Sequence, residues 1–415
     1  MADFPILTKL NETLNEEKWT RATLSAYSVH QIKELDALFH EAAVEKALDE
    51  VREICSEHLN HSKNSIAALY ILGLISLSRQ QIDDSNMVTL INIFADNKRW
   101  NIVEYVCERI LEYGENRNAL VRLAECYENE DKPDKMYAVW ERLVRVDYEE
   151  ADIVKLIAER KEKEADIEAA IEYYRKALHR FINKGLFSNV KELWSKLIEL
   201  APGDIEFFNH VQRKIAKQIS EDRAASLLTE LYKHYKNTKD WETAISLLKT
   251  IIAYDDKNPG IRKEIVECYR AKYAEHSQLE EYIRLSNLAQ SYRNINEAIS
   301  EFEKHISFDI GNYVYHRTWN IGRIKSIKGS EIVIDFAKKR GHSMGIKMAV
   351  DSLTTLSKDH IWVLKAVWSK EKLHDAIKTD IPWALRTVIK SYNNYADIKK
   401  IKAELVPSVL SPSEW

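Results

Sequence analysis

Apolar residues recur every three or four positions through most of the chain, the pattern of amphipathic helices packed against one another. The clearest unit has an apolar-faced segment at 119–127, a turn at 130–133 and a second such segment at 135–144. Pro133 stands where the second helix would begin, a position whose N–H needs no partner within the helix. The pattern therefore predicts a pair of antiparallel helices joined by a short turn.

Such helix pairs repeat along the chain. Motifs typical of the second helix occur at Cys107–Leu111, Trp140–Val144, Tyr174–Leu178, Trp194–Ile198 and Leu248–Ile252. The first three are 33 and 34 residues apart, the period of tetratricopeptide repeats, and the register is expected to slip after Tyr174. Stacked pairs of this kind form a solenoid with a concave binding face. We predict N-terminal helices over 1–63 and a tetratricopeptide-like α-solenoid over 64–305, whose concave face binds other proteins.

After Phe308 apolar and polar residues alternate, which is the period of β-strands. Strands are predicted at 311–319, 321–327, 331–336, 342–347 and 360–366, with a helical turn at 348–356. Five short, tightly turned strands indicate a small SH3/Tudor-like β-barrel, which we place at 306–366. Residues 367–415 are predicted to form C-terminal helices. The predicted fold class is therefore mainly α, an α-solenoid followed by a small β-barrel and a short helical segment.

Composition and charge support this division. Only 10 Gly and 7 Pro occur in 415 residues, which favours long helices with short turns. Residues 1–305 carry a net charge of −11 and residues 306–415 carry +7. The change of sign places a domain boundary near residue 305.

Several features point to the cytoplasm. The four cysteines form no C-x-x-C pair, so buried free thiols of a reducing compartment are predicted. The first residues have no basic region of a secretion signal. The most apolar stretch, Ile66–Leu77, is 12 residues long, whereas a membrane span needs about 20. The chain is expected to be cytoplasmic and to have no membrane partner.

The last residues predict the start of another helix. Ser411 and Glu414 have the spacing of a capping box, and Pro412 occupies the first helical position that proline favours. A helix of four residues is not stable alone. We therefore expect a further domain after Trp415.

The barrel segment resembles two known families. Residues 311–327 resemble the opening of CarD-type RNA-polymerase-interacting barrels, with Asn320 where those modules often have Gly. A longer run is similar to the N-terminal extension of unusually long bacterial Gre-type transcription elongation factors, in which a helical array and a barrel precede the GreA domains. Its matching positions are Tyr313–His316, Trp319–Gly322, Ile334–Phe336, Gly341–Met344, Ala349, Leu353, Leu356, Asp359–His360 and Glu414–Trp415.

The resemblance implies association with RNA polymerase during elongation. The transcript-cleavage chemistry of the Gre family uses acidic residues at the tip of a coiled coil, which help to hold a metal in the polymerase active site. No such hairpin is evident in this sequence, so no catalytic residue is carried over. We predict a chain that is not an enzyme and needs no cofactor. The alternative is a general tetratricopeptide-type scaffold unrelated to transcription.

The barrel segment also carries a basic surface that contains aromatic residues. Its predicted binding residues are His316, Trp319, Arg323, Lys325, Lys338, Lys339, Arg340 and Lys347. Such a surface suits either the phosphates of a nucleic-acid backbone or an acidic protein, and the sequence leaves both open. A metal site formed by His316, His342, His360 and Asp335 is a further alternative, although these spacings match no known ligand pattern.

Overall fold

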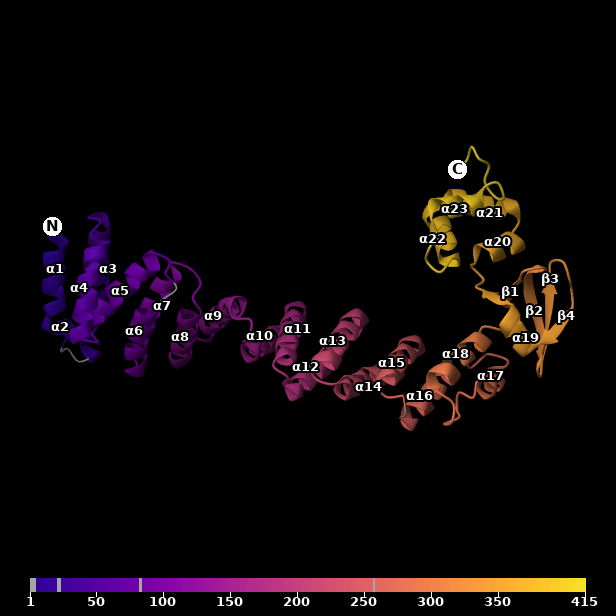
Figure 1. Cartoon of the computed structure of the whole chain (residues 1–415), viewed down its shortest axis with the longest axis horizontal. Helices are drawn as coiled ribbons and strands as arrows, with labels where there is room; N and C mark the ends of the chain where they lie inside the picture. Colours follow the sequence, from indigo (N-terminus) through magenta and orange to yellow (C-terminus); the bar gives the residue numbers. More distant parts are fainter. Residues whose placement is uncertain (1–4, 21–23, 82–83, 257) are drawn as a thin grey trace. The chain divides into compact units, whose positions relative to one another are not determined.

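The computed structural model describes residues 5–20, 24–81, 84–256 and 258–415. The chain divides into two compact units, residues 1–219 and residues 220–415. The helices follow one another along the chain, and one small sheet lies near the C-terminus (Figure 1). No helix in these ranges is long and apolar enough to cross a membrane.

The first unit is entirely helical in its described parts. Its elements are α1 (Pro5–Asn15), α2 (Glu17–Thr20), the 3-10 turn Leu24–Ala26, α3 (Val29–Val44), α4 (Leu48–His61), α5 (Ile66–Ser78), α6 (Ser85–Asp96), α7 (Trp100–Leu111), α8 (Arg117–Asn129), α9 (Pro133–Val146), α10 (Ala151–Lys163), α11 (Ile167–Asn183), α12 (Phe187–Leu200) and α13 (Ile205–Gln218). The apolar stretch within Ile66–Leu77 forms α5, whose residues Ile66–Ile75 are buried on every side.

The second unit continues the helices and then changes to strands. Its elements are α14 (Glu221–Asn237), α15 (Trp241–Tyr254), α16 (Pro259–Lys272), α17 (Leu279–Leu285), α18 (Ile295–Ile306), β1 (Tyr313–His316), β2 (Asn320–Lys328), β3 (Glu331–Phe336), β4 (His342–Gly345), α19 (Ile346–Ser352), β5 (Thr354–Leu356), α20 (Ile361–Val367), α21 (Lys370–Thr379), α22 (Ile381–Ser391) and α23 (Ile398–Leu405). The predicted fold class is confirmed.

The period of 33 to 34 residues holds as far as α11 and lengthens after it, as the expected slip of register after Tyr174 implies, but the assignment of Trp194–Ile198 to a second helix is wrong. Alternate helices α7, α9, α11, α13, α15 and α17 begin at residues 100, 133, 167, 205, 241 and 279, so their spacing grows from 33 to 38 residues. Trp194 lies in α12, on the other helix of its pair, and is fully buried. The motif at Trp194–Ile198 looked like a second helix because both helices of a pair bury an aromatic and aliphatic face.

Left-handed residues close several turns between paired helices. At the end of α10 the N–H of Ala165 donates to the carbonyl of Glu162, and the N–H of Asp166 donates to that of Lys161. This is the Schellman arrangement, which needs a residue with positive φ, usually glycine. Here Ala165 has a φ of 62°, and Asp131 and Lys98 repeat the geometry with values of 54° and 55°. The chain therefore makes tight turns with few glycines.

Buried tyrosines link neighbouring helices by donating a hydrogen bond to a carboxylate that also pairs with a lysine. Between α10, α11 and α12 the hydroxyl of Tyr174 donates to Glu162 at 2.7 Å, and Lys196 pairs with the same carboxylate at 2.8 Å. We call such a group of tyrosine, carboxylate and lysine a tyrosine clasp. Others are Tyr232–Glu264–Lys236 and Tyr269–Glu303–Lys249. A hydrogen-bonded, neutralised carboxylate of this kind is a structural element.

The small barrel-like domain contains a five-stranded antiparallel sheet with the order β4-β3-β2-β1-β5. Alternate residues of the strands point into its core, as the period-2 pattern predicts, and Val314, Ile324, Ile332, Ile334 and Phe336 are buried. A bulge in β2 at Lys325 interrupts the register with β3. Gly322 is required by close packing, because a Cβ there would lie 2.5 Å from Phe336 Cδ1.

The predicted fifth strand at 360–366 is wrong. Residues Ile361–Val367 form α20, which begins where the Nδ1 atom of His360 accepts the N–H of Trp362 at 3.1 Å. A short apolar run fits a buried strand or a buried helix equally well by periodicity. The fifth strand is β5, which pairs with β1 inside the segment that had been predicted as a helical turn.

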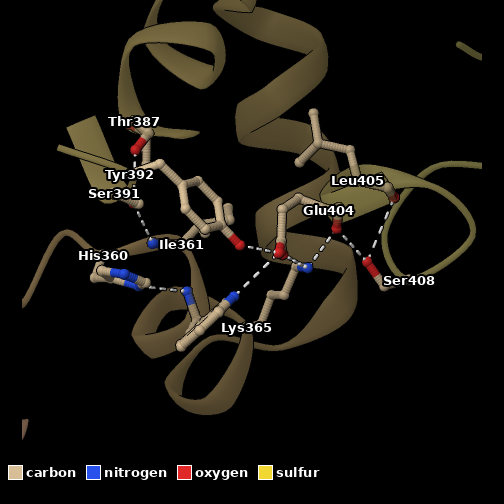
Figure 2. Close-up of polar contacts among 10 residues, drawn as sticks. His360, Ile361, Lys365, Thr387, Ser391, Tyr392, Glu404, Leu405 and Ser408 are labelled. Atoms are coloured by element: carbon tan, nitrogen blue, oxygen red, sulfur yellow. Dashed lines mark hydrogen bonds and ion pairs between the residues drawn. The ribbon is translucent and has the colours of Figure 1, made fainter. Parts of the chain in front are cut away.

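The C-terminal helices share their own core and a polar network. Residues of α20–α23, including Leu373, Val388 and Leu405, pack together. Glu404 lies at the centre of the network and accepts from Lys365, Trp362 and Tyr392, which forms another tyrosine clasp (Figure 2). Burial raises the pKa of Glu404, but the three hydrogen bonds outweigh it and lower the pKa below its usual value.

The four cysteines, Cys55, Cys107, Cys126 and Cys268, are free and buried, as predicted. Burial raises the pKa of Cys55 to about 12, so its thiol stays protonated and unreactive.

Candidate partner-binding site on the β-barrel

Trp319 is the centre of an aromatic and basic cluster on the barrel. It lies in the loop between β1 and β2, and its ring stacks on that of His316, with centroids 4.1 Å apart. The His342 ring contacts it at 4.3 Å, and Phe336 lies beneath at 5.4 Å. Lys339 places its Nζ 4.7 Å from the Trp319 ring centroid. We call these five residues the Trp319 cluster.

The β1–β2 turn sets the position of Trp319. His316 Nδ1 accepts the N–H groups of Thr318 and Trp319 at 3.1 and 3.3 Å, which holds the loop against the end of β1. Asn320 follows with a φ of 60°, a conformation that asparagine tolerates better than most residues with a side chain. This explains why asparagine can stand where the CarD-type barrels that the segment resembles often have glycine.

Asp335 shapes the second loop of the surface, Ala337–Gly341. Its carboxylate accepts the N–H of Gly341 at 2.7 Å and lies 3.7 Å from the Lys325 ammonium. The hydrogen bond from Gly341 and the charge of Lys325 lower the pKa of Asp335 below its usual value. The hydrogen bond to Asp335 thus fixes the end of the loop, on which Lys338, Lys339 and Arg340 lie exposed.

Most of the predicted cations on this surface form no close ion pair. Among the described residues, Arg323, Lys338, Arg340 and Lys347 form no ion pair, and Lys339 rests on Trp319 instead of a carboxylate. Lys325 pairs with Asp335 alone. Partial burial, Lys339 and His316 lower the pKa of His342, so its imidazole is neutral at pH 7. The surface offers a set of unpaired positive charges around an aromatic centre.

Lys347 lies at a different place from the Trp319 cluster. It extends from α19 and lines a groove of about 520 Å³ with residues of α18 and the turn that precedes it, including Arg293, Glu301 and His305. The structure therefore gathers His316, Trp319 and Lys339 into one cluster, places Lys338 and Arg340 on the adjoining loop, and leaves Lys347 at the groove.

The metal alternative does not fit this arrangement. His360 caps α20, and Asp335 is engaged by Gly341 and Lys325. His316 and His342 both contact the Trp319 ring. Across the described ranges, no three metal-ligating side chains converge.

The geometry also bears on whether a nucleic-acid base can stack here. A base needs an open aromatic face. The faces of Trp319 already contact His316 and Lys339, so stacking would first require one of these contacts to break.

Sequence reasoning missed two members of the cluster. Phe336 pairs with Gly322, and His342 pairs with Ile334. The register of the strands therefore brings both side chains next to the β1–β2 turn. Correct alignment of β2, β3 and β4 from their alternating pattern would have found them.

The sequence has clear similarities to known proteins. Residues 362–415 match the family model of the GRAD helix-turn-helix domain. The chain is 51% identical over 392 residues to a "Putative GreA-associated domains protein" of Treponema pallidum, covering 94% of this chain and 60% of that protein. It is 38% identical over 415 residues to "Transcription elongation factor GreA" of Borreliella burgdorferi, covering 100% of this chain and 46% of that protein.

The chain therefore spans about half the length of the curated relatives that it matches. Among solved structures it is similar to YrrB, a TPR protein with an unusual peptide-binding site, with 13% identity and a TM-score of 0.26. That match covers 46% of this chain and 95% of the other.

Proposed function

Because both relatives confirm the resemblance to long GreA-type proteins, we propose that this chain is the non-catalytic interaction region of a transcription elongation factor. In this proposal the barrel associates with RNA polymerase through the Trp319 cluster and the neighbouring cations, and the solenoid binds other proteins. Such a role would be carried out in the cytoplasm. The observation that carries the proposal is the similarity of the whole chain to a protein named as an elongation factor.

The barrel surface supports the proposed docking site through its charges. Unpaired cations around a half-buried tryptophan suit a negatively charged protein surface, where Trp and Arg side chains commonly supply much of the binding energy. The cluster is also pre-shaped, since His316 and Asp335 hold the two loops through backbone hydrogen bonds. A pre-shaped surface loses less conformational entropy on binding.

The experiment is capture of purified RNA polymerase by the immobilised chain. We expect the variant Trp319→Ala/Lys338→Glu/Lys339→Glu to bind at least about tenfold more weakly, because it removes the aromatic centre and reverses two charges. Far-ultraviolet circular dichroism should stay unchanged, since these side chains lie on loops of the barrel.

The matched control is Tyr148→Ala/Lys217→Glu/Lys233→Glu, which replaces one aromatic residue with alanine and reverses two lysine charges at exposed positions of the solenoid. It should capture polymerase like the unchanged chain. Equal capture by both variants would move the docking site elsewhere. If the unchanged chain captures no polymerase, the general scaffold becomes the better account.

A further inference from the structure

A groove of about 410 Å³ lies between α14, α15 and α16. Its floor is apolar: Leu248 and Ile251 are each 2% exposed, and Ala225 and Ile261 line its sides. The rim carries the hydroxyl groups of Ser226, Thr229 and Tyr232 and the carboxylates of Asp222, Asp255 and Glu264. All these residues belong to the second compact unit. We call this the α14–α16 groove.

The α14–α16 groove differs in its charges from the corresponding groove between α10, α11 and α12. That groove, of about 620 Å³, is also lined by acids, but each of them faces a lysine. Lys155 pairs with Glu192 at 2.5 Å and with Glu159 at 3.7 Å. Lys196 pairs with Glu162 and Glu199 at 2.8 and 3.7 Å. Its charges are thus satisfied within the fold.

Among the carboxylates of the α14–α16 groove, only that of Glu264 pairs with a lysine. It belongs to a tyrosine clasp with Tyr232 and Lys236. The side-chain carboxylates of Asp222 and Asp255 form no hydrogen bond or ion pair with any residue that the structure describes. Two carboxylates therefore lie beside an apolar floor without a counter-charge.

Two of the three hydroxyl groups of the groove, those of Thr229 and Tyr232, can only accept further hydrogen bonds. Thr229 Oγ1 already donates its hydrogen to the carbonyl of Ala225 at 2.8 Å. The Tyr232 hydroxyl donates to Glu264. Ionised carboxylates are acceptors as well. A ligand rich in donors, with an apolar part for Leu248 and Ile251, complements this lining.

We propose that the α14–α16 groove binds a segment of a partner protein in which lysine or arginine lies beside apolar side chains. Lysine offers three donors and arginine five, and their aliphatic stems pack on apolar surface while the charged head meets a carboxylate. The inference rests on the proposed function only in that the solenoid is taken to bind proteins. The segment proposed to bind the solenoid is basic, whereas the protein surface expected to bind the barrel is acidic.

Binding of fluorescein-labelled peptides to the full chain, followed by fluorescence anisotropy, tests the proposal. The basic probe has the sequence Leu-Lys-Ser-Leu-Arg-Ser-Leu-Lys. One comparison peptide replaces its basic residues with Glu, and another replaces its Leu residues with Ser. We expect saturable binding of the basic probe alone, weakened by added salt. The variant Asp222→Asn/Asp255→Asn should bind it about tenfold more weakly.

Asp152→Asn/Glu168→Gln is the matched control, because it removes two exposed carboxylates from helices outside this groove. It should bind the basic probe like the unchanged chain, as should Trp319→Ala/Lys338→Glu/Lys339→Glu. Absence of saturable binding, equal binding of the acidic peptide, or equal losses in the two acid-to-amide variants would overturn the proposal. Polymerase capture by Asp222→Asn/Asp255→Asn should be unchanged, so failure here is distinguishable from failure of the barrel docking site.

Discussion

Ion pairs are frequent between elements of the solenoid, whereas most of the basic residues on the barrel surface form none with a described residue. In the solenoid, many cations pair with carboxylates of other helices or loops, as Arg142 of α9 does with Glu115 of the α7–α8 loop at 3.1 Å and Lys155 of α10 with Glu192 of α12 at 2.5 Å. On the barrel, Lys338, Arg340 and Arg323 have no ion pair with any described residue. A charge that the fold does not use costs little to retain on the surface and remains available to a partner. Under the proposed function, this difference separates charges that stabilise the solenoid from charges that are available to a partner of the barrel.

The largest effect on stability is expected where a substitution removes one partner of a partly buried ion pair. Glu404→Gln should lower the free energy of unfolding of the C-terminal helices by about 3 kcal/mol, because it leaves the Lys365 ammonium without its counter-charge. Urea unfolding followed by tryptophan fluorescence measures this. Glu281→Gln breaks an exposed pair with Arg284 and should cost less than about 1 kcal/mol. Similar losses for both variants would show that the clasp around Glu404 is not structural.

Gly322→Ala tests the support beneath the Trp319 cluster. The added Cβ would lie 2.5 Å from Phe336 and 2.7 Å from Ile334, so the barrel core must shift, at a cost of about 2 kcal/mol. The same urea experiment, with polymerase capture as a second measurement, should show lower stability and weaker binding. Gly345→Ala meets nothing closer than 3.9 Å and serves as the control. If a destabilised Gly322→Ala variant captured polymerase as well as the unchanged chain does, the Trp319 cluster would not be part of the docking site.

Acid should weaken the C-terminal helices through Glu404. Its pKa is lower in the folded chain than the 4.5 of a free glutamate, so its stabilising contribution is complete above about pH 5 and is lost as pH falls through the lowered pKa. The stability difference between the unchanged chain and Glu404→Gln, measured in urea at several pH values, should therefore shrink below about pH 4.5. A difference that stays constant down to pH 3 would contradict this assignment.

The smallest effect concerns a turn between two helices of the solenoid, at the uncharged residue Ala165. Ala165→Gly should stabilise the solenoid by about 0.5–1 kcal/mol, because Ala165 has a φ of 62° that glycine adopts without strain. Thermal unfolding followed by circular dichroism measures the gain. Ala158→Gly, in the interior of α10, should instead destabilise the chain. Destabilisation by both changes would mean that the turn does not constrain Ala165.

Local pattern predicted much of this fold, and its errors share one cause. Periods of 3.6 and 2 identified the helices and the sheet, because each element buries one face. The run that begins at Ile361 was misassigned, since four apolar residues satisfy either period and only the cap at His360 selects a helix. Trp194 was placed on the wrong helix of its pair because both helices bury aromatic residues.

The candidate site was predictable in chemistry and only partly in geometry. Charge and residue type selected Trp319, His316 and Lys339, which the structure brings together. The contacts of Phe336 and His342 depend on strand register, and the separate location of Lys347 depends on how α19 follows β4. Such long-range placement is not encoded in any short stretch of sequence.

The most direct test of the account is a comparison of two charge reversals in binding to purified RNA polymerase. Lys338→Glu/Lys339→Glu changes unpaired charges of the barrel, and Lys155→Glu/Lys196→Glu changes paired charges of the solenoid. We predict that the barrel variant binds at least about tenfold more weakly, with a reduced dependence on salt, while the solenoid variant loses stability but keeps its affinity. Equal affinity in the two variants, or loss in the solenoid variant alone, would contradict it.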